Sequence, residues 1–192
     1  MKYILGILAI ALIVGGTIVG FRMGKNDSDD TVTPATNQTT KSSDSAKVLD
    51  LSNTGITKVD SSIYSKTDTT DLILSNNSIK TLPSEMGKMD NVVIFKIDHN
   101  LLDGSLIGEI RQMSKLKILD VSYNKMTGMP AEIGQLSNLE TLNYSYNDIT
   151  GLPNELANLK NNLKEFDLTG NPLSQDQISS LRASLPDTNI IF

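Results

Sequence analysis

Two stretches of the chain are near copies of each other. "LDVSYNKMTGMPAEIG" spans residues 119–134, and "LNYSYNDITGLPNELA" spans residues 142–157. The second begins 23 residues after the first (142 minus 119), with the apolar residues, the Asn and the Pro at matching positions. A fixed period of roughly 20–50 residues is typical of repeat architectures, in which stacked copies of one unit bury a continuous core.

From residue 46 onward the chain divides into six such units. They begin "AKVLDLSNT", "TTDLILSNN", "VVIFKIDHN", "LKILDVSYN", "LETLNYSYN" and "LKEFDLTGN", so each reads apolar-x-x-L-x-L-x-x-N with some substitutions. Their ninth residues are Thr54, Asn77, Asn100, Asn124, Asn147 and Asn171, spaced by 23, 23, 24, 23 and 24. The alternating L-x-L predicts a short strand whose alternate side chains point inward. One such strand cannot make a core, whereas a stack of them can.

The second half of each unit sharpens the pattern. "SIKTLPSEMGKMDN", "KMTGMPAEIGQLSN" and "DITGLPNELANLKN" follow x-L-x-x-L-P-x-x-I-G-x-L-x-x. Residues 46–192 therefore resemble leucine-rich repeat proteins of the LxxLxLxxNxIxxLPxxIGxL subtype. This repeat is similar to that of Ras-binding scaffolds and plant intracellular Ras-group proteins, and it is also frequent in bacterial surface proteins. The departures are Thr54 in place of the first Asn, Thr69 in place of a Leu, and "LLDGSLIGEIRQM", which lacks the Pro and carries one extra residue.

The resemblance implies an α/β solenoid. Parallel β-strands would line its concave face, and short helices or turns its convex face. It also implies that five Asn side chains form a ladder of hydrogen bonds with buried loop backbone: Asn77, Asn100, Asn124, Asn147 and Asn171. The alternative for these residues is an exposed turn, since Asn tolerates left-handed conformations. The strict period directly after each strand favours the ladder.

The last unit differs from the others, as terminal repeats do. Ser174 and Gln177 form a capping-box pattern at a helix start. Ile178, Leu181 and Leu185 then share one helical face, and Pro186 follows. We expect a helical cap over about residues 174–192, with "NIIF" as a final strand. The repeat domain would thus span residues 46–192.

The first 45 residues have a different composition. Residues 3–21 contain no charged residue and lie between Lys2 and Arg22. A helix of that length would reach across the ~30 Å hydrocarbon core of a bilayer. We therefore expect a membrane anchor over residues 1–25, with a cleaved signal peptide as the alternative. Residues 26–45 hold nine Ser or Thr residues and predict a disordered linker.

The flanking charges are nearly balanced, but a short tail before one large domain favours a single-pass protein whose repeat domain lies outside the cytoplasm. The repeats have no Cys-rich cap, because the chain has no Cys. We expect a bacterial, membrane-anchored surface protein.

The positions that point outward from the strands are the candidate binding residues. Three are bulky aliphatics where polar residues would suffice: Ile73, Ile94 and Ile118. His99, Tyr123 and Tyr146 are expected to stack on adjacent strands, about 4.8 Å apart, in the middle of the face. Tyr beside an aliphatic residue is typical of binding hot spots. The remaining candidates are polar or charged and would form a mostly acidic rim: Lys96, Asp98, Asp120, Asn143 and Asp167. Cross-strand packing and simple repeat duplication are the alternative explanations.

Composition narrows the function. The chain has no Cys, one His and a formal net charge of −5, so a nucleic-acid binder, which needs a basic surface, is not expected. The sequence has no G-x-S-x-G turn, zinc-protease motif or phosphate loop, so we expect neither catalysis nor a cofactor. The hypothesis is a membrane-tethered module that binds a basic or mixed-charge protein or peptide on its concave face. The alternatives are a cell-envelope adhesion or carbohydrate-binding protein, and a cytoplasmic scaffold of the Ras type.

Overall fold

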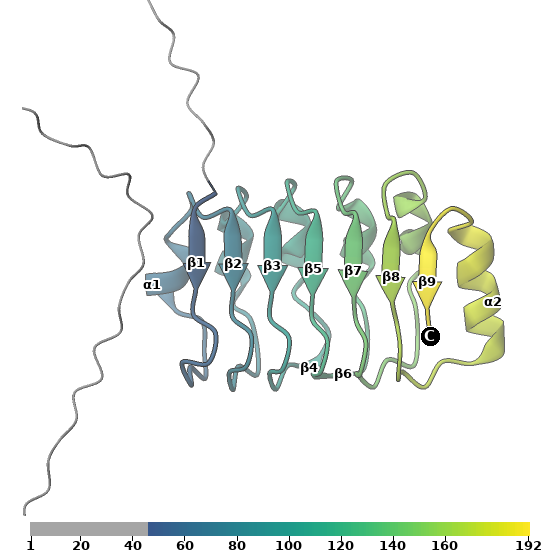
Figure 1. The fold of residues 1–192 in the computed structure, drawn as a ribbon, viewed down its shortest axis with the longest axis horizontal. Coiled ribbons are helices and arrows are strands. Elements are labelled where there is room, and N and C mark those ends of the chain that lie inside the picture. Colours follow the sequence, from purple (N-terminus) through teal and green to yellow (C-terminus); the bar gives the residue numbers. More distant parts are fainter. Residues whose placement is uncertain (1–45) are drawn as a thin grey trace, which may run out of the picture. The chain divides into compact units, whose positions relative to one another are not determined.

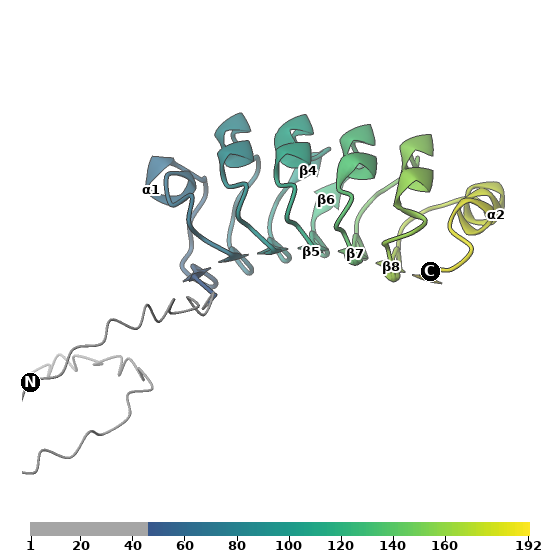
Figure 2. The same cartoon turned by 90° about the horizontal axis from the view of Figure 1, so that it is seen from above.

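The computed structural model describes residues 46–192, which form a repeat solenoid (Figures 1 and 2). The helix expected over residues 3–21 and the linker expected over residues 26–45 lie outside the described residues. Within residues 46–192, no helix is long and apolar enough to cross a membrane.

One sheet of seven parallel strands runs the length of the solenoid (Figure 1). Its strands are β1 (Val48–Asp50), β2 (Asp71–Ile73), β3 (Ile94–Lys96), β5 (Ile118–Asp120), β7 (Thr141–Asn143), β8 (Glu165–Asp167) and β9 (Asn189–Ile191). Neighbouring repeats pair without any shift in register, so that Leu72, Phe95 and Leu119 lie side by side. The strands stand where the L-x-L pattern predicted them, but each is only three residues long.

Short helices cover the other face of the sheet, on the outer side of the arc in Figure 2. After α1 (Ser61–Tyr64), four 3-10 helices follow: η1 (Ser84–Lys88), η2 (Gly108–Gln112), η3 (Ala131–Gln135) and η4 (Asn154–Leu159). Pro83, Pro130 and Pro153 stand directly before three of them, in an extended conformation. A Pro with its fixed φ suits a helix start, where no backbone N–H donor is needed. Ile107 takes this place in the third repeat, which lacks the Pro.

The core lies between the sheet and the helices. The middle residue of each strand points into it, and Phe95, Leu119 and Leu142 are fully buried. The two flanking residues of each inner strand stay at least partly exposed, as the alternation of side chains along a strand requires. The core is closed at its C-terminal end by α2 (Gln175–Ser184); Leu181 in this helix and Leu185, the residue that caps its C-terminus, are buried.

The predicted cap is confirmed in its local structure. The Ser174 and Gln177 side chains make both bonds of a capping box at the start of α2. The last strand, β9, pairs in parallel with β8. Its neighbour Phe192 lies under the guanidinium of Arg182, 5.1 Å from the ring centre.

The extra residue of the third repeat has a local consequence. It is accommodated where β4 (Asp103–Gly104) pairs with β6 (Lys125–Met126) in a small second sheet. Gly104 has a φ of 72°, a left-handed conformation that suits glycine.

Candidate binding surface

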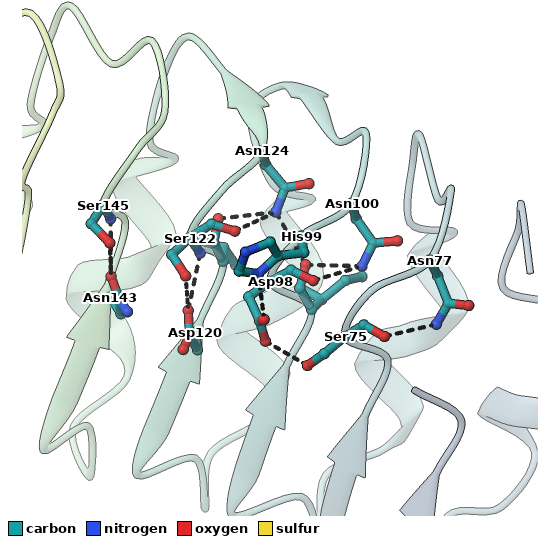
Figure 3. Close-up of polar contacts among 12 residues, drawn as sticks. Ser75, Asn77, Asp98, His99, Asn100, Asp120, Ser122, Asn124, Asn143 and Ser145 are labelled. Atoms are coloured by element: carbon teal, nitrogen blue, oxygen red, sulfur yellow. Dashed lines mark hydrogen bonds and ion pairs between the residues drawn. The ribbon is translucent and has the colours of Figure 1, made fainter. Parts of the chain in front are cut away.

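Asn side chains join successive coils of the solenoid, and Figure 3 shows three of them, Asn77, Asn100 and Asn124. The amide nitrogen of Asn124 donates to the carbonyls of Ile97 (3.1 Å) and Val121 (3.0 Å). Its side-chain oxygen accepts from the backbone N–H of Leu102 at 2.9 Å. The same two-sided pattern recurs at Asn77, Asn100, Asn147 and Asn171. At the exposed start of the series, the Thr54 hydroxyl donates to the Leu51 carbonyl.

The residue before each of these positions has a left-handed backbone. The φ angles are 58° at Asn53, 56° at Asn76, 52° at His99, 52° at Tyr123, 54° at Tyr146 and 78° at Gly170. Gly adopts this conformation freely and Asn, Asp and His adopt it more readily than other residues, whereas Tyr carries a penalty of roughly 1–2 kcal/mol. Three consecutive coils thus hold a His or a Tyr where the outer coils use Asn or Gly.

The prediction that His99, Tyr123 and Tyr146 lie on the strands was wrong. The strands end three residues earlier, at Lys96, Asp120 and Asn143. Past the strand ends, the backbone N–H groups of His99 and Tyr123 still donate to the next coil, at Ser122 O and Ser145 O, and the left-handed turn at these residues then changes the direction of the chain. The aromatic residues therefore form a row along one edge of the sheet face and not its middle.

The three aromatic rings stack on one another. The His99 and Tyr123 ring centres lie 4.2 Å apart with an interplanar angle of 15°, and those of Tyr123 and Tyr146 lie 4.4 Å apart at 18°. Tyr123 is 44% exposed and Tyr146 47% exposed. We call this row, His99, Tyr123 and Tyr146, the aromatic ridge. Partial desolvation raises the pKa of the Tyr123 hydroxyl, and Tyr146 and Asp167 raise that pKa further.

The ridge exposes ring edges more than ring faces. Both faces of Tyr123 are covered, one by His99 and the other by Tyr146. Beyond Tyr146 the next coil places Gly170, where an added Cβ would lie 3.0 Å from the Tyr146 ring. The glycine therefore lets the backbone of that coil approach the stack closely. The hydroxyl-bearing edges of the tyrosines are the surface that remains for a partner.

Several polar residues expected on the rim also make bonds within their own turn. The Ser122 N–H and hydroxyl donate to Asp120 Oδ1 at 3.0 and 2.7 Å, and Asn143 accepts the same pair of bonds from Ser145. Such turns let the side chain of a strand's last residue hold the backbone two residues on. The Ser122 and Ser145 side chains are consequently buried.

The same bond recurs in the outer repeats. Asp167 Oδ1 accepts from the Thr169 N–H at 2.8 Å, and Asp50 Oδ1 from the Ser52 N–H at 2.9 Å. The Ser52 N–H, with help from the Ser52 side chain, lowers the pKa of the Asp50 carboxyl. These carboxylates are thus both rim residues and structural acceptors.

A second arrangement replaces these turns where the strands end in Ile73 and Lys96, which cannot accept. Ser75 Oγ donates to Asp98 Oδ1, and Asp98 Oδ2 lies 2.9 Å from His99 Nδ1 (Figure 3). A hydrolase nucleophile needs its hydroxyl bonded to the imidazole. Here the Ser75 hydroxyl is bonded to the Asp98 carboxylate, so the arrangement stabilises the position of the His99 ring in the ridge.

The face of the sheet beside the ridge carries two rows of side chains, set by the strand register. The first row consists of Asp71, Ile94, Ile118, Thr141 and Glu165, and the second of Ile73, Lys96, Asp120, Asn143 and Asp167. Ile73, Ile94 and Ile118 are half-buried, and Lys96 is exposed. The structure thus places all eleven predicted binding residues on one side of the solenoid. Seven lie on strands β2 to β8, and the other four, Asp98, His99, Tyr123 and Tyr146, lie in the turns that follow β3, β5 and β7.

Sequence reasoning missed a second series of Asn contacts at the opposite edge. Asn91 Nδ2 donates to the Thr67 carbonyl at 2.9 Å, and Asn138 Nδ2 to the Ser114 carbonyl at 2.8 Å. Asn162 makes the corresponding contact with Ser137. Their signal was an Asn directly before the first apolar residue of a unit, as in "DNVVIF", "SNLETL" and "NNLKEF". Among residues 46–192, no group of three His, Asp or Glu side chains could hold a metal ion.

Residues 114–173 match the family described as leucine rich repeat. The leucine-rich repeat and fibronectin type III domain-containing protein 1 of Danio rerio is 36% identical over 63 residues, which are 32% of this chain and 11% of the relative. The chain thus spans only a small part of that relative.

Two solved structures show the same fold. A leucine-rich repeat protein of Leptospira interrogans is 29% identical with a TM-score of 0.56, covering 70% of this chain and 40% of its own. The ectodomain of a membrane receptor kinase from Arabidopsis thaliana, in complex with Casparian strip integrity factor 2, is 26% identical with a TM-score of 0.63. That match covers 76% of this chain and 18% of the receptor chain.

Proposed function

We propose that this leucine-rich repeat protein is a non-enzymatic module that binds a polypeptide partner on its sheet face. The observation that carries the proposal is the aromatic ridge, which combines exposure with backbone strain. Exposed tyrosines with a large apolar surface and a polar edge are typical anchors of protein interfaces.

The fold does not need aromatic residues at these positions. The same chain places Asn53, Asn76 and Gly170 at the equivalent positions of other coils, where the left-handed backbone is easier to adopt. The stacking of His99, Tyr123 and Tyr146 offsets part of the strain, since aromatic pairs contribute about 0.5–1.5 kcal/mol. Strain retained on an exposed surface favours a role in recognition.

The geometry of the ridge favours a polypeptide over a carbohydrate. A sugar ring packs on the open face of an aromatic ring, and both faces of Tyr123 are covered by its neighbours. Ring edges with hydroxyl groups, beside isoleucines and carboxylates, suit the mixture of apolar and polar groups that a peptide presents. The solved Arabidopsis ectodomain, which has the same fold, is a receptor domain in complex with a partner.

The proposal includes a location. Residues 3–21 would anchor the chain in a membrane and hold the repeat domain outside the cytoplasm, where its partner would be an envelope or external protein. Protease added to intact cells that express the chain should then digest the repeat domain while a cytoplasmic control protein survives. Protection of the repeat domain until the membrane is lysed would instead favour the cytoplasmic scaffold.

A displayed library of random peptides, selected on the full-length chain in detergent, tests the binding function. The variant is Tyr123→Asn with Tyr146→Asn, because Asn is the residue that other coils use there. Relief of backbone strain should balance the lost stacking, so the fold should be kept. Gln112→Asn with Gln135→Asn, two exposed changes on the helix side, is the matched control.

We expect enriched peptides to bind the tyrosine variant at least tenfold more weakly, the effect of losing a typical hot spot. The control variant should bind them as the parent does. Enrichment of no peptide, or equal binding to both variants, would contradict the proposal.

A further inference from the structure

The sheet face beside the ridge is not uniform along the solenoid. On β3 and β5, Ile94 and Ile118 stand next to each other in the first row. Two strands further, β8 carries Glu165 in the first row and Asp167 in the second. Apolar side chains therefore gather toward the middle of the sheet, and two carboxylates lie together near its C-terminal end.

The Glu165 and Asp167 carboxylates keep oxygen atoms that make no hydrogen bond or ion pair within the described residues. Only Oδ1 of Asp167 is engaged, by the Thr169 N–H, which fixes the orientation of that carboxylate. Within residues 46–192, no hydrogen bond or ion pair occupies the Glu165 carboxylate, which is exposed. Cations are therefore free to approach both groups. A basic side chain would suit this end of the face, whereas the isoleucine pair suits an aliphatic side chain.

The spacing between these two areas can be worked out from the sheet. Neighbouring strands lie about 4.8 Å apart, so β8 lies roughly 10 Å from Ile118 and roughly 14 Å from Ile94. The centre of the isoleucine pair is thus about 12 Å from the carboxylates. An extended peptide crossing the strands rises about 3.3 Å per residue and points alternate side chains to the same side.

Only even separations place two side chains of such a peptide on this face. A separation of two residues spans about 6.6 Å, four residues about 13 Å, and six residues about 20 Å. The four-residue separation matches the distance of about 12 Å between the isoleucines and the carboxylates. Odd separations would direct one of the two side chains away from the sheet.

We infer that the partner presents an extended segment in which an aliphatic residue and a Lys or Arg stand four positions apart. The aliphatic side chain lies on Ile94 and Ile118, and the basic side chain lies between Glu165 and Asp167. The segment runs parallel to the aromatic ridge, with the second row of side chains between them, and the tyrosine edges contact side chains of the partner that reach across that row. This inference rests on the proposed function, because it specifies the partner of the same surface.

The peptides enriched on the full-length chain provide the test. In the tightest ridge-dependent peptide, the basic residue is moved to separations of two, three, four, five and six from the aliphatic residue, in both chain directions. Affinity is measured by fluorescence anisotropy with the labelled peptide. The separation of four should bind best, and replacing the basic residue by Glu should abolish the preference.

Substitutions that copy the equivalent residues of the neighbouring repeat identify which side chains hold the peptide. Asp167→Asn and Glu165→Thr copy Asn143 and Thr141, which occupy the same rows in the neighbouring repeat. Together they should weaken the four-residue peptide about tenfold, as expected for two partly exposed charge pairs. Asp148→Asn with Glu155→Gln makes the same change in net charge at exposed positions off this face and should have little effect. Ile94→Thr with Ile118→Thr should remove the preference for an aliphatic residue.

The outcomes separate the inference from the proposed function. Ridge-dependent peptides that bind equally well at odd and even separations would overturn the inference alone. So would ridge-dependent binding that the Asp167 and Glu165 changes do not weaken. Failure to enrich any ridge-dependent peptide would overturn both.

Discussion

Replacing Asn124 by Ala removes one rung from the middle of the Asn series. The side chain is buried and makes hydrogen bonds with four backbone groups: the carbonyls of Ile97, Val121 and Ser122, and the N–H of Leu102. The size of the effect depends on which of these groups keep another partner.

All three carbonyls keep a partner. Ile97 O still accepts from the Asn100 side chain at 3.2 Å, Val121 O from the Asn147 side chain at 3.0 Å, and Ser122 O from the His99 backbone N–H at 3.0 Å. The Leu102 N–H has no second acceptor among the described residues and is left buried without a bond. One unsatisfied buried donor costs about 1–3 kcal/mol, so we expect the free energy of unfolding to fall by about 2 kcal/mol.

Equilibrium unfolding in urea, followed by circular dichroism, measures this change. Thr54→Ala is the control, because Thr54 is the exposed first member of the series and Leu51 O keeps the Asn77 side chain as a donor. The control should lose less than about 0.5 kcal/mol. Equal losses in the two variants, or a loss below 0.5 kcal/mol for Asn124→Ala, would refute the view that these bonds hold the coils together.

Changes at Tyr144, Gly134 and Glu140 test the packing and the charges of the solenoid. Tyr144→Phe should stabilise the protein by about 1 kcal/mol, because the buried Tyr144 hydroxyl has no partner among the described residues. Burial also raises the pKa of Tyr144, so the parent should lose stability by about 1.4 kcal/mol per unit as pH rises above 10, and thermal melts of the Phe variant should show a shallower loss. Gly134→Ala should destabilise by about 1–3 kcal/mol in urea unfolding, because a Cβ there would overlap the Glu155 carbonyl, whereas Gly151→Ala meets open space and should change little. Lys164 and Lys117 lower the pKa of Glu140, so the contribution of this carboxylate to the free energy of unfolding is present above its ordinary pKa of 4.5 and is lost on acidification below it. The difference in stability between the parent and Glu140→Gln, measured against pH, should show this loss.

The repeat pattern allowed much of the fold to be predicted. The apolar letters at a period of 23 or 24 residues place strands β2 to β8, and Ser174 with Gln177 places the start of α2. These features are predictable because they depend on local burial and on a local cap. The same residue types recur at the same positions of every repeat, so an incorrect alignment of one repeat would disagree with the next repeat.

The placement of the aromatic residues could not be read from alternation alone. In the sequence, the alternation of inward and outward side chains continues from Lys96 through Asp98, whereas strand β3 ends at Lys96. The signal was present in the equivalent residues of other repeats, since Asn53, Asn76 and Gly170 are all types that tolerate a positive φ. The bonds of Asp120 and Asp167 to their own turns were missed for the same reason.

The most direct test of binding on the sheet face is an NMR titration of the isoleucine methyl groups with an enriched peptide. Ile73, Ile94 and Ile118 lie on that face, whereas Ile110 of η2 and Ile133 of η3 are fully buried and serve as internal controls. We expect saturable shifts at Ile94 and Ile118 that are absent in the Tyr123→Asn and Tyr146→Asn variant. Shifts confined to the helix side, or unchanged in that variant, would contradict this expectation.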